Sequence, residues 1–144
     1  MDFNVGKSVK QLDNELNSKL NAMLTQWNLT RSQFFILTFL MINANQEISQ
    51  KDIELAFHLK NPTVSGIVKL LEKNGFIKRQ VNPADKRYNL LFLTGKSRAL
   101  KPLIFKFMRN SDRQILKGFS EKEKKQLENF LERMIKNISG TRDL

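Results

Sequence analysis

The chain has 144 residues, of which 40% are hydrophobic, so it has enough apolar material to bury a core and is not expected to be disordered. Its 25 Lys and Arg against 14 Asp and Glu give a formal net charge of +11, which favours a polyanionic partner. The absence of cysteine excludes disulfides, thiolate metal sites and cysteine-based redox sensing. We find neither the ~20 consecutive apolar residues of a membrane span nor an apolar N-terminal signal stretch, so we expect a cytoplasmic protein.

The first half of the chain has the pattern of four helices. Apolar residues at helical spacing predict a first helix of roughly twenty residues, marked by Val9, Leu12, Leu16, Leu20, Met23 and Trp27. Thr30 and Gln33 form a capping-box pair that opens the second helix. Ser49 caps a short third helix, with Asp52 in its first turn. A tight turn then leads to the fourth, so the third and fourth helices form a helix-turn-helix.

The fourth helix, over residues 61–75, has the pattern of a DNA-recognition helix. Asn61 is its predicted N-cap, Pro62 its first helical residue and Gly75 its end. One side is apolar and faces a core, whereas the opposite side is small, polar or basic. Such a surface can enter a major groove and contact phosphates. The residues assigned to DNA here are Lys60, Asn61, Pro62, Thr63, Ser65, Lys69 and Lys73.

Two β-like runs follow, at residues 76–81 and 88–93. The segment between them is rich in turn-forming and charged residues, so the pair should form a hairpin with Lys86 and Arg87 at its tip. Residues 60–98 contain nine Lys or Arg against two acidic residues, a net charge of +7. The basic excess therefore lies on the predicted helix and hairpin, which suits nucleic acid. The alternative is a solvated basic surface that serves solubility.

The C-terminal part should form two more helices. Thr94 caps the first, and Ser120 with Glu123 forms a capping box for the second, which ends near Gly140. Helices of twenty residues are ~30 Å long, more than a winged unit can cover, so a second copy of the chain is the expected partner. The alternative is a monomer in which the flanking helices close over one core. The dimerisation residues are expected to be Leu12, Leu16, Leu127, Phe130, Leu131 and Met134.

The expected fold is therefore mainly α with a small β-wing. A winged helix-turn-helix over residues 30–97 would be flanked by an N-terminal dimerisation helix (1–29) and by C-terminal dimerisation helices (98–144).

An ordered set of segments resembles the MarR family of winged-helix regulators. The matching segments are residues 29–37 (LTRSQFFIL), 49–53 (SQKDI), 62–65 (PTVS), 71–79 (LEKNGFIKR), 85–87 (DKR) and 93–94 (LT). The resemblance implies a homodimer on a near-palindromic operator, with helix 61–75 in the major groove. It also implies that Arg87 reaches into the minor groove and is oriented by Asp85, as suits a guanidinium in a narrow groove. The alternative for Asp85 and Arg87 is an ordinary exposed ion pair.

The resemblance further implies a repressor that is relieved by a small aromatic or drug-like ligand, bound where the helical region meets the winged domain. The helices are rich in Phe and Met, although such residues more often belong to a core. Two positions depart from the family pattern. Glu54 occupies a place that is usually a small Ala, and Thr94-Gly-Lys-Ser97 replaces an acidic-then-Gly pattern.

Other functions fit the residues less well. His58 is the single His, and without Cys or a glycine-rich phosphate loop neither an enzyme nor a cofactor or metal is expected. A sequence-tolerant architectural DNA-binding protein is the main alternative. Against it are Asn61, Thr63 and Ser65, which can read base edges. Binding to a membrane surface through the last helix is disfavoured by its mixed charge, with Glu121, Glu123, Glu128 and Glu132 among the lysines.

Overall fold

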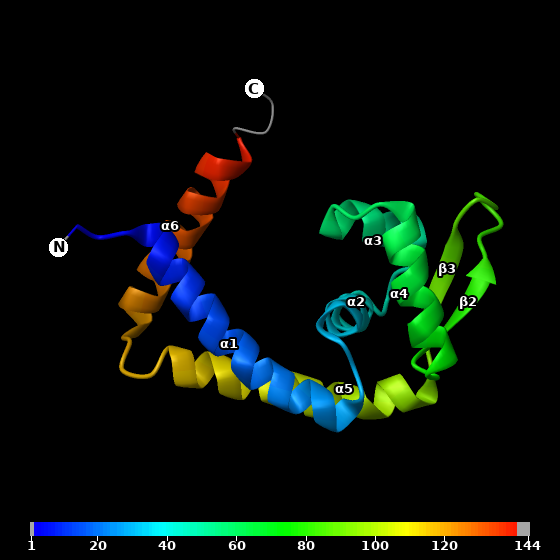
Figure 1. Cartoon of the computed structure of the whole chain (residues 1–144), viewed down its shortest axis with the longest axis horizontal. Coiled ribbons are helices and arrows are strands. Elements are labelled where there is room, and N and C mark those ends of the chain that lie inside the picture. The colour runs from blue at the N-terminus through cyan, green and yellow to red at the C-terminus, as the bar shows by residue number, and fades with distance from the viewer. Residues whose placement is uncertain (1, 141–144) are drawn as a thin grey trace. The chain divides into compact units, whose positions relative to one another are not determined.

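The computed structural model describes residues 2–140 and shows six helices and three short strands in that range (Figure 1). In chain order they are α1 (Val5–Trp27), α2 (Arg31–Ile42), β1 (Ile48–Ser49), α3 (Gln50–Phe57), α4 (Asn61–Lys73), β2 (Ile77–Val81), β3 (Asn89–Leu93), α5 (Gly95–Ile115) and α6 (Glu121–Ser139). The expected fold class, mainly α with a small β-wing, is confirmed. Within the described range, every helix is too short or too polar to cross a membrane.

The backbone divides into two compact units, Met1–Lys101 and Pro102–Leu144, and α5 begins in the first and ends in the second. The first unit contains α1 to β3 and the start of α5, and the second contains the later turns of α5 and all of α6. The division expected from the sequence, into residues 1–29, 30–97 and 98–144, is a division by role and stays a prediction. Residues 1 and 141–144, at the ends of the first and last of those segments, lie outside the described residues.

The capping residues start their helices as expected. Complete capping boxes open α2 and α6, at Thr30 with Gln33 and at Ser120 with Glu123. The start of α3 has the same arrangement, because the Ser49 hydroxyl accepts from the Asp52 N–H at 3.2 Å and an Asp52 carboxylate oxygen accepts from the Ser49 N–H at 2.8 Å. These bonds satisfy N–H groups that have no partner within the helix.

The start of α4 differs from the prediction by one residue. Lys60, not Asn61, is the N-cap, and its side chain makes no capping hydrogen bond within the described residues. The Lys60 carbonyl accepts the first hydrogen bonds of the helix, from the N–H groups of Thr63 and Val64, both at 3.1 Å. Pro62 is therefore the second helical residue. It is tolerated there because none of the first four N–H groups of a helix has an intrahelical partner. The expected end is confirmed, since Gly75 follows the last turn with a φ of 79°.

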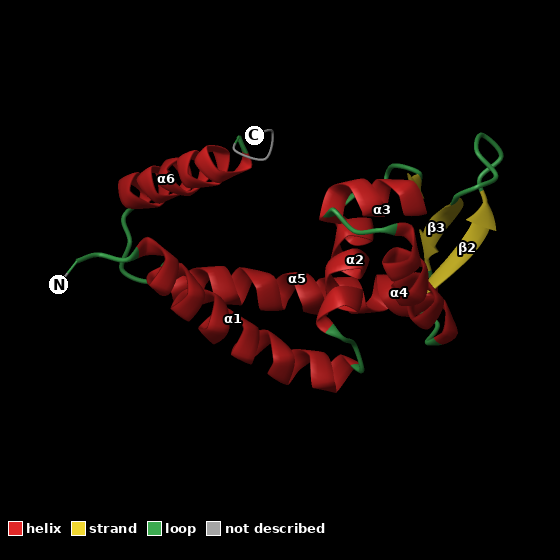
Figure 2. Cartoon of the chain, turned by 45° about the horizontal axis from the view of Figure 1, so that its top comes forward, coloured by secondary structure: helices red, strands yellow, loops and turns green. Residues whose placement is uncertain are grey.

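The wing is a three-stranded antiparallel sheet in the order β1-β3-β2. The expected hairpin is confirmed, with Ile77 opposite Leu93 and Val81 opposite Asn89, and it lies beside α4 (Figure 2). Strand β1 was not predicted from the sequence. It pairs with the middle of β3 through only two residues, which is too short to show the alternation by which a strand is recognised.

The core of the first unit lies where α2, α3, α4 and the sheet meet. Its most completely buried side chains, each 0–1% exposed, are Ile36, Leu37, Met41, Ile53, Val64, Val68, Leu71, Phe76 and Ile77. Helix α1 is joined to α2 by the stacked rings of Trp27 and Phe34, whose centroids lie 6.4 Å apart. The helix-turn-helix is thus built on α2, and one side of α4 is part of the core.

Glu54, which stands where the family pattern has a small Ala, is half-buried on α3. One of its carboxylate oxygens, Oε2, is buried and has no hydrogen-bond partner among the described residues. The side chain therefore does not point freely into solvent.

In the second unit the turn between α5 and α6 contains Gly118 in the left-handed conformation, with a φ of 87°. Helix α6 is C-capped by Gly140, as expected. Every residue of α6 lies in the described range and none is buried, so the apolar residues expected to face a second copy of the chain are accessible to solvent.

Candidate nucleic-acid interface

Helix α4 presents its polar side outward because its apolar side is fully occupied by the core. Val64, Val68 and Leu71 are all 0% exposed. On the other side the residues assigned to DNA from the sequence are exposed, except that Ser65 is half-buried; they are Lys60, Asn61, Pro62, Thr63, Ser65, Lys69 and Lys73. Short polar groups at the start of the helix and lysines toward its end therefore share one accessible surface, which has the chemistry to meet base edges and phosphates.

The last turn of α4 is tied to strand β2 by an ion pair to which the sequence analysis gave no role. An Arg79 guanidinium nitrogen donates to Glu72 Oε1 at 2.9 Å, and the Arg79 backbone N–H donates to Glu72 Oε2 at 3.2 Å. The hydrogen bond from Arg79 lowers the pKa of the Glu72 carboxyl below its ordinary value, although burial opposes the shift. Recognition helix and wing are thereby joined at one point.

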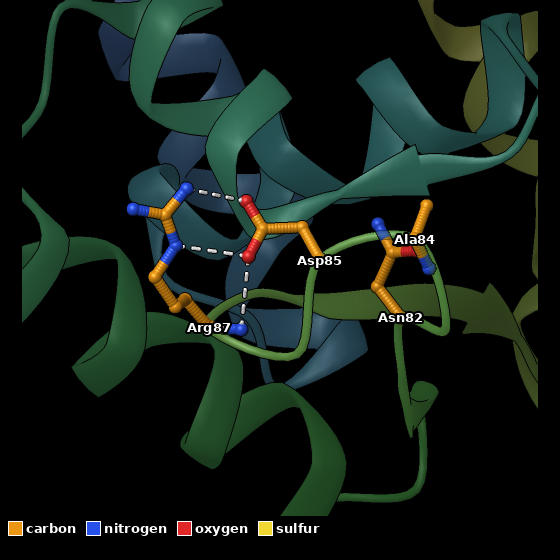
Figure 3. Close-up of polar contacts among 4 residues, drawn as sticks. All are labelled: Asn82, Ala84, Asp85 and Arg87. Atoms are coloured by element: carbon orange, nitrogen blue, oxygen red, sulfur yellow. Dashed lines mark hydrogen bonds and ion pairs between the residues drawn. The ribbon is translucent and has the colours of Figure 1, made fainter.

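The ion pair expected at the wing tip is present (Figure 3). Arg87 donates from Nε to Asp85 Oδ1 at 2.9 Å and from Nη2 to Oδ2 at 2.8 Å, and its backbone N–H donates to Oδ1 at 3.2 Å. The Arg87 side chain is nevertheless 80% exposed. Two parallel hydrogen bonds fix the plane of the guanidinium, and Nη1 is left facing outward from the pair. Asp85 thus fixes the orientation of Arg87, and Lys86 is exposed beside it; contact of Arg87 with a minor groove stays a prediction.

Tyr88 and Asn89 join the wing to α3, and neither was singled out from the sequence. The Tyr88 ring lies 5.5 Å from Lys51 Nζ and 5.7 Å from Arg87 Cζ, within the range of cation–π attraction. The Asn89 amide donates to Gln50 Oε1 at 2.9 Å, and Gln50 is only 4% exposed. The position of the wing tip therefore depends on α3 as well as on its own turn. No local sequence pattern indicates these contacts.

The remaining titratable candidates are few. His58 is the left-handed C-cap of α3, with a φ of 51°, and is exposed there. Within residues 2–140 no group of three or more His, Cys, Asp or Glu side chains could hold a metal ion.

The comparisons with known proteins agree with this geometry. The MarR family model matches residues 27–87. The chain is 30% identical to the HTH-type transcriptional regulator MgrA of Staphylococcus aureus, over 85% of this chain and 81% of that protein. Its structure is similar to a MarR protein from Peptoclostridium difficile, with a TM-score of 0.86, 25% identity and coverage of 97% and 90% of the two chains.

A second similar structure is a putative MarR family transcriptional regulator from Listeria monocytogenes complexed with a 26mer DNA. Its TM-score is 0.83 at 32% identity, and 96% of this chain and 91% of that chain are covered. Fold and family model together place the chain in the class of winged helix-turn-helix transcriptional regulators, whose members are not enzymes. The chain belongs to the MarR family of transcriptional regulators.

The wing-tip pair has a measurable signature in its acid titration. Hydrogen bonds from the Arg87 side chain and then its backbone lower the pKa of the Asp85 carboxyl from 3.8 to about 2. Because the folded pKa is the lower one, the pair is complete above pH 4 and is lost as the pH falls through about 2. A carbon-detected NMR titration of the Asp85 carboxyl should therefore have its midpoint near 2, and Arg87→Ala should raise it toward 3.8.

Lys86→Ala is the matched control, because it removes a neighbouring positive charge and leaves the hydrogen bonds of Asp85 in place. It should leave the midpoint near the wild-type value. An ordinary Asp85 midpoint in the wild-type protein would show that the pair is not formed in solution.

Proposed function

We propose that the protein is a homodimeric, sequence-specific regulator that binds a near-palindromic operator with one winged domain on each half-site. We further propose that it represses transcription and is relieved by a small aromatic or drug-like ligand. The observation that carries the DNA part is that one unit has two features suited to contact DNA. These are the outward polar side of α4 and an arginine held at an exposed wing tip by two hydrogen bonds.

The side chains of these two features suit different parts of a DNA duplex. Asn61, Thr63 and Ser65 at the start of α4 are short hydrogen-bonding side chains suited to base edges in the major groove. Lys69 and Lys73 follow on the same side and are suited to phosphates. Arg87 is suited to the electronegative minor groove beside the half-site. The 26mer DNA in the Listeria relative supports duplex DNA as the partner.

A sequence-tolerant architectural protein is the alternative, and the two hypotheses predict different effects of substitutions on DNA affinity and sequence preference. Selection of duplexes from a random pool by the wild-type protein should yield a palindromic consensus. Lys69→Ala and Lys73→Ala should weaken all sequences alike, and each lost phosphate contact should reduce the log–log salt slope by ~0.9. Asn61→Ala or Ser65→Ala should change which bases are accepted, by about 1–3 kcal/mol per lost base contact.

Arg87→Ala should weaken binding to the selected operator, and Asp85→Ala should weaken it less.

The measurement is a fluorescence-anisotropy titration of the selected duplex and of a scrambled duplex at several salt concentrations. Equal, sequence-independent losses in all the α4 variants would favour the architectural reading. Wild-type affinity in both wing variants would remove the wing from the interface.

The dimer is supported by apolar side chains that the single chain leaves in water. On α1, Leu12 is 49% exposed and Leu16 is half-buried. On α6, Phe130 is 52% and Leu131 is 42% exposed, and Leu127 and Met134 are half-buried. Burial is worth ~25 cal/mol per Å² of apolar surface, so a partner that covers these side chains would stabilise the assembly by several kcal/mol. A second copy offers the same surface.

Phe130→Asp tests the dimer, because it places a charge on the apolar stripe of α6. We expect the wild-type protein to sediment at twice its 16.8 kDa chain mass at micromolar concentration and the variant to shift toward the single chain. Asn129→Asp is the matched control, since it adds the same charge at the neighbouring exposed position and should remain dimeric. Circular dichroism separates loss of assembly from loss of folding. A wild-type protein of single-chain mass would refute the homodimer.

The effector is the finest part of the proposal. The first unit contains a cavity of about 550 Å³ between the end of α2, β1, the end of β3 and the start of α5. Leu40, Ile48 and Leu91 contribute apolar surface, and Arg98 and Lys101 also line it. This mixture suits an apolar molecule with one anionic group. None of the helical Phe and Met residues considered for a ligand site lines this cavity, which contains Phe92 of β3 instead.

Operator titrations with and without a panel of aromatic acids and cationic drugs test the effector. A ligand that weakens operator binding tenfold must favour the low-affinity conformer by ~1.4 kcal/mol, and DNA must weaken the ligand by the same factor. Arg98→Ala should reduce the effect of an acid that binds in this cavity. Affinity that stays constant across the panel would leave a constitutive regulator.

A further inference from the structure

The start of α5 is attached to the end of the recognition helix by three side chains, which we call the α5 latch: Thr94, Lys96 and Ser97. The Thr94 hydroxyl donates to the Gly75 carbonyl at 2.6 Å, and the Lys96 ammonium donates to the Asn74 carbonyl at 2.8 Å. The Ser97 hydroxyl donates to the Phe76 carbonyl. Three successive carbonyls, at the C-cap of α4 and at the two residues after it, thus each receive a side-chain donor from residues 94–97 at the start of α5.

The latch supplies donors to carbonyls at and just beyond the end of α4, of which the Phe76 carbonyl also accepts from the Thr94 N–H at 3.3 Å. The last carbonyls of a helix have no intrahelical partner, and a cation near them also meets the negative end of the helix dipole. Lys96 supplies that cation and lies 4.3 Å from the centroid of the Phe76 ring. Ser97 and Phe76 are 0% and 1% exposed, so water has little access to replace their hydrogen bond. This is the segment in which the chain departs from the family's acidic-then-Gly pattern, and a Gly in place of Ser97 would have no hydroxyl to donate.

The two ends of α4 are held very differently. At its beginning the N-cap Lys60 makes no side-chain capping bond within the described residues, and Asn61 is exposed. At its end α4 is bound by the α5 latch and by the pair between Glu72 and Arg79. The beginning of α4 is thus held by the packing of Val64, whereas the polar side-chain contacts that orient the helix lie at its end.

We infer that Thr94, Lys96 and Ser97 are positioning residues for sequence reading by α4. A helix of 13 residues is about 20 Å long, so a tilt of roughly 3° at the held end moves the reading end by about 1 Å. Base contacts require placement within ~0.5 Å, whereas lysines on flexible stems still reach phosphates. Breaking the α5 latch therefore lowers discrimination between DNA sequences more than it lowers general affinity. This inference rests on the proposed sequence-specific binding.

The test compares variants that lose one latch hydrogen bond with variants that keep all of them. Thr94→Val and Ser97→Ala remove latch hydroxyls, Lys96→Met removes an exposed latch donor at little risk to folding, and Thr94→Ser restores the hydroxyl. Thr38→Val is the matched control, because Thr38 is 6% exposed and its hydroxyl bonds only within α2, to the Phe34 carbonyl at 3.0 Å and the Phe35 carbonyl at 3.0 Å. Thermal denaturation establishes that each variant is folded and how far its stability changes.

The readout is the ratio of affinities for the duplex selected by the wild-type protein and for a scrambled duplex of the same composition and salt. We expect Thr94→Val, Ser97→Ala and Lys96→Met each to reduce this ratio by about tenfold, equivalent to losing roughly one base contact. Affinity for scrambled DNA should change little in the two hydroxyl variants. If the Lys96 ammonium contacts a phosphate, Lys96→Met should lower the affinity for both duplexes by the same factor. Thr94→Ser and Thr38→Val should retain the wild-type ratio.

Two results overturn the inference. The latch residues are merely structural if the folded latch variants keep the wild-type ratio, or if Thr38→Val lowers it as much as they do. A wild-type ratio near one is a separate result that contradicts the proposed sequence reading itself, and the positioning role with it.

Discussion

Helix α4 must be held firmly from one side while the other side stays bare, and the architecture of the first unit follows from that constraint. Val64, Val68 and Leu71 are completely buried against α2, α3 and the sheet, and burying such a side chain is worth ~1.5–3 kcal/mol. The outer side of α4 is left exposed, as the proposed DNA binding requires, because its short polar groups can reach bases only if the helix enters a groove. Further supports therefore attach at the end of α4, through β2 and the start of α5.

Stability and recognition depend on different polar contacts in this unit. The pair between Asp85 and Arg87 is exposed, and such pairs add little to folding. If Arg87 contacts DNA as we propose, the pair presents a guanidinium whose plane is already set, so that less conformational freedom is lost on binding. The bond between Ser97 and Phe76 is buried, and its loss would leave the Phe76 carbonyl with only the Thr94 N–H, at 3.3 Å, and little access to water. The Ser97 contact at the end of α4 is thus buried, whereas the wing-tip pair is open to solvent.

The flanking helices α1 and α6 differ from α4, because they expose apolar side chains where α4 exposes polar ones. The exposed Phe130 and Leu131 lie on a helix whose other side mixes acidic and basic residues, including a 2.9 Å pair between Glu121 and Lys124. A mixed polar side of this kind suits a solvated outer face better than an anionic membrane surface. An apolar protein surface would cover the apolar side chains of α6 better than a membrane would, and a second copy of α6 has such a surface.

Local interactions made much of this protein readable from sequence alone. The capping boxes, the hairpin and the two sides of α4 each depend on residues within a few positions of one another, and their expected positions are confirmed. The start of α4 was misplaced because Asn61 and Lys60 are both compatible with the position, and only the backbone entering from His58 decides between them. Other features join residues far apart in sequence. The bond from Asn89 to Gln50 spans 39 residues, that from Thr94 to Gly75 spans 19, and β1 finds its partner across the helix-turn-helix. Such contacts exist only once the core has brought the segments together, so tertiary structure alone determines how the reading surface is oriented.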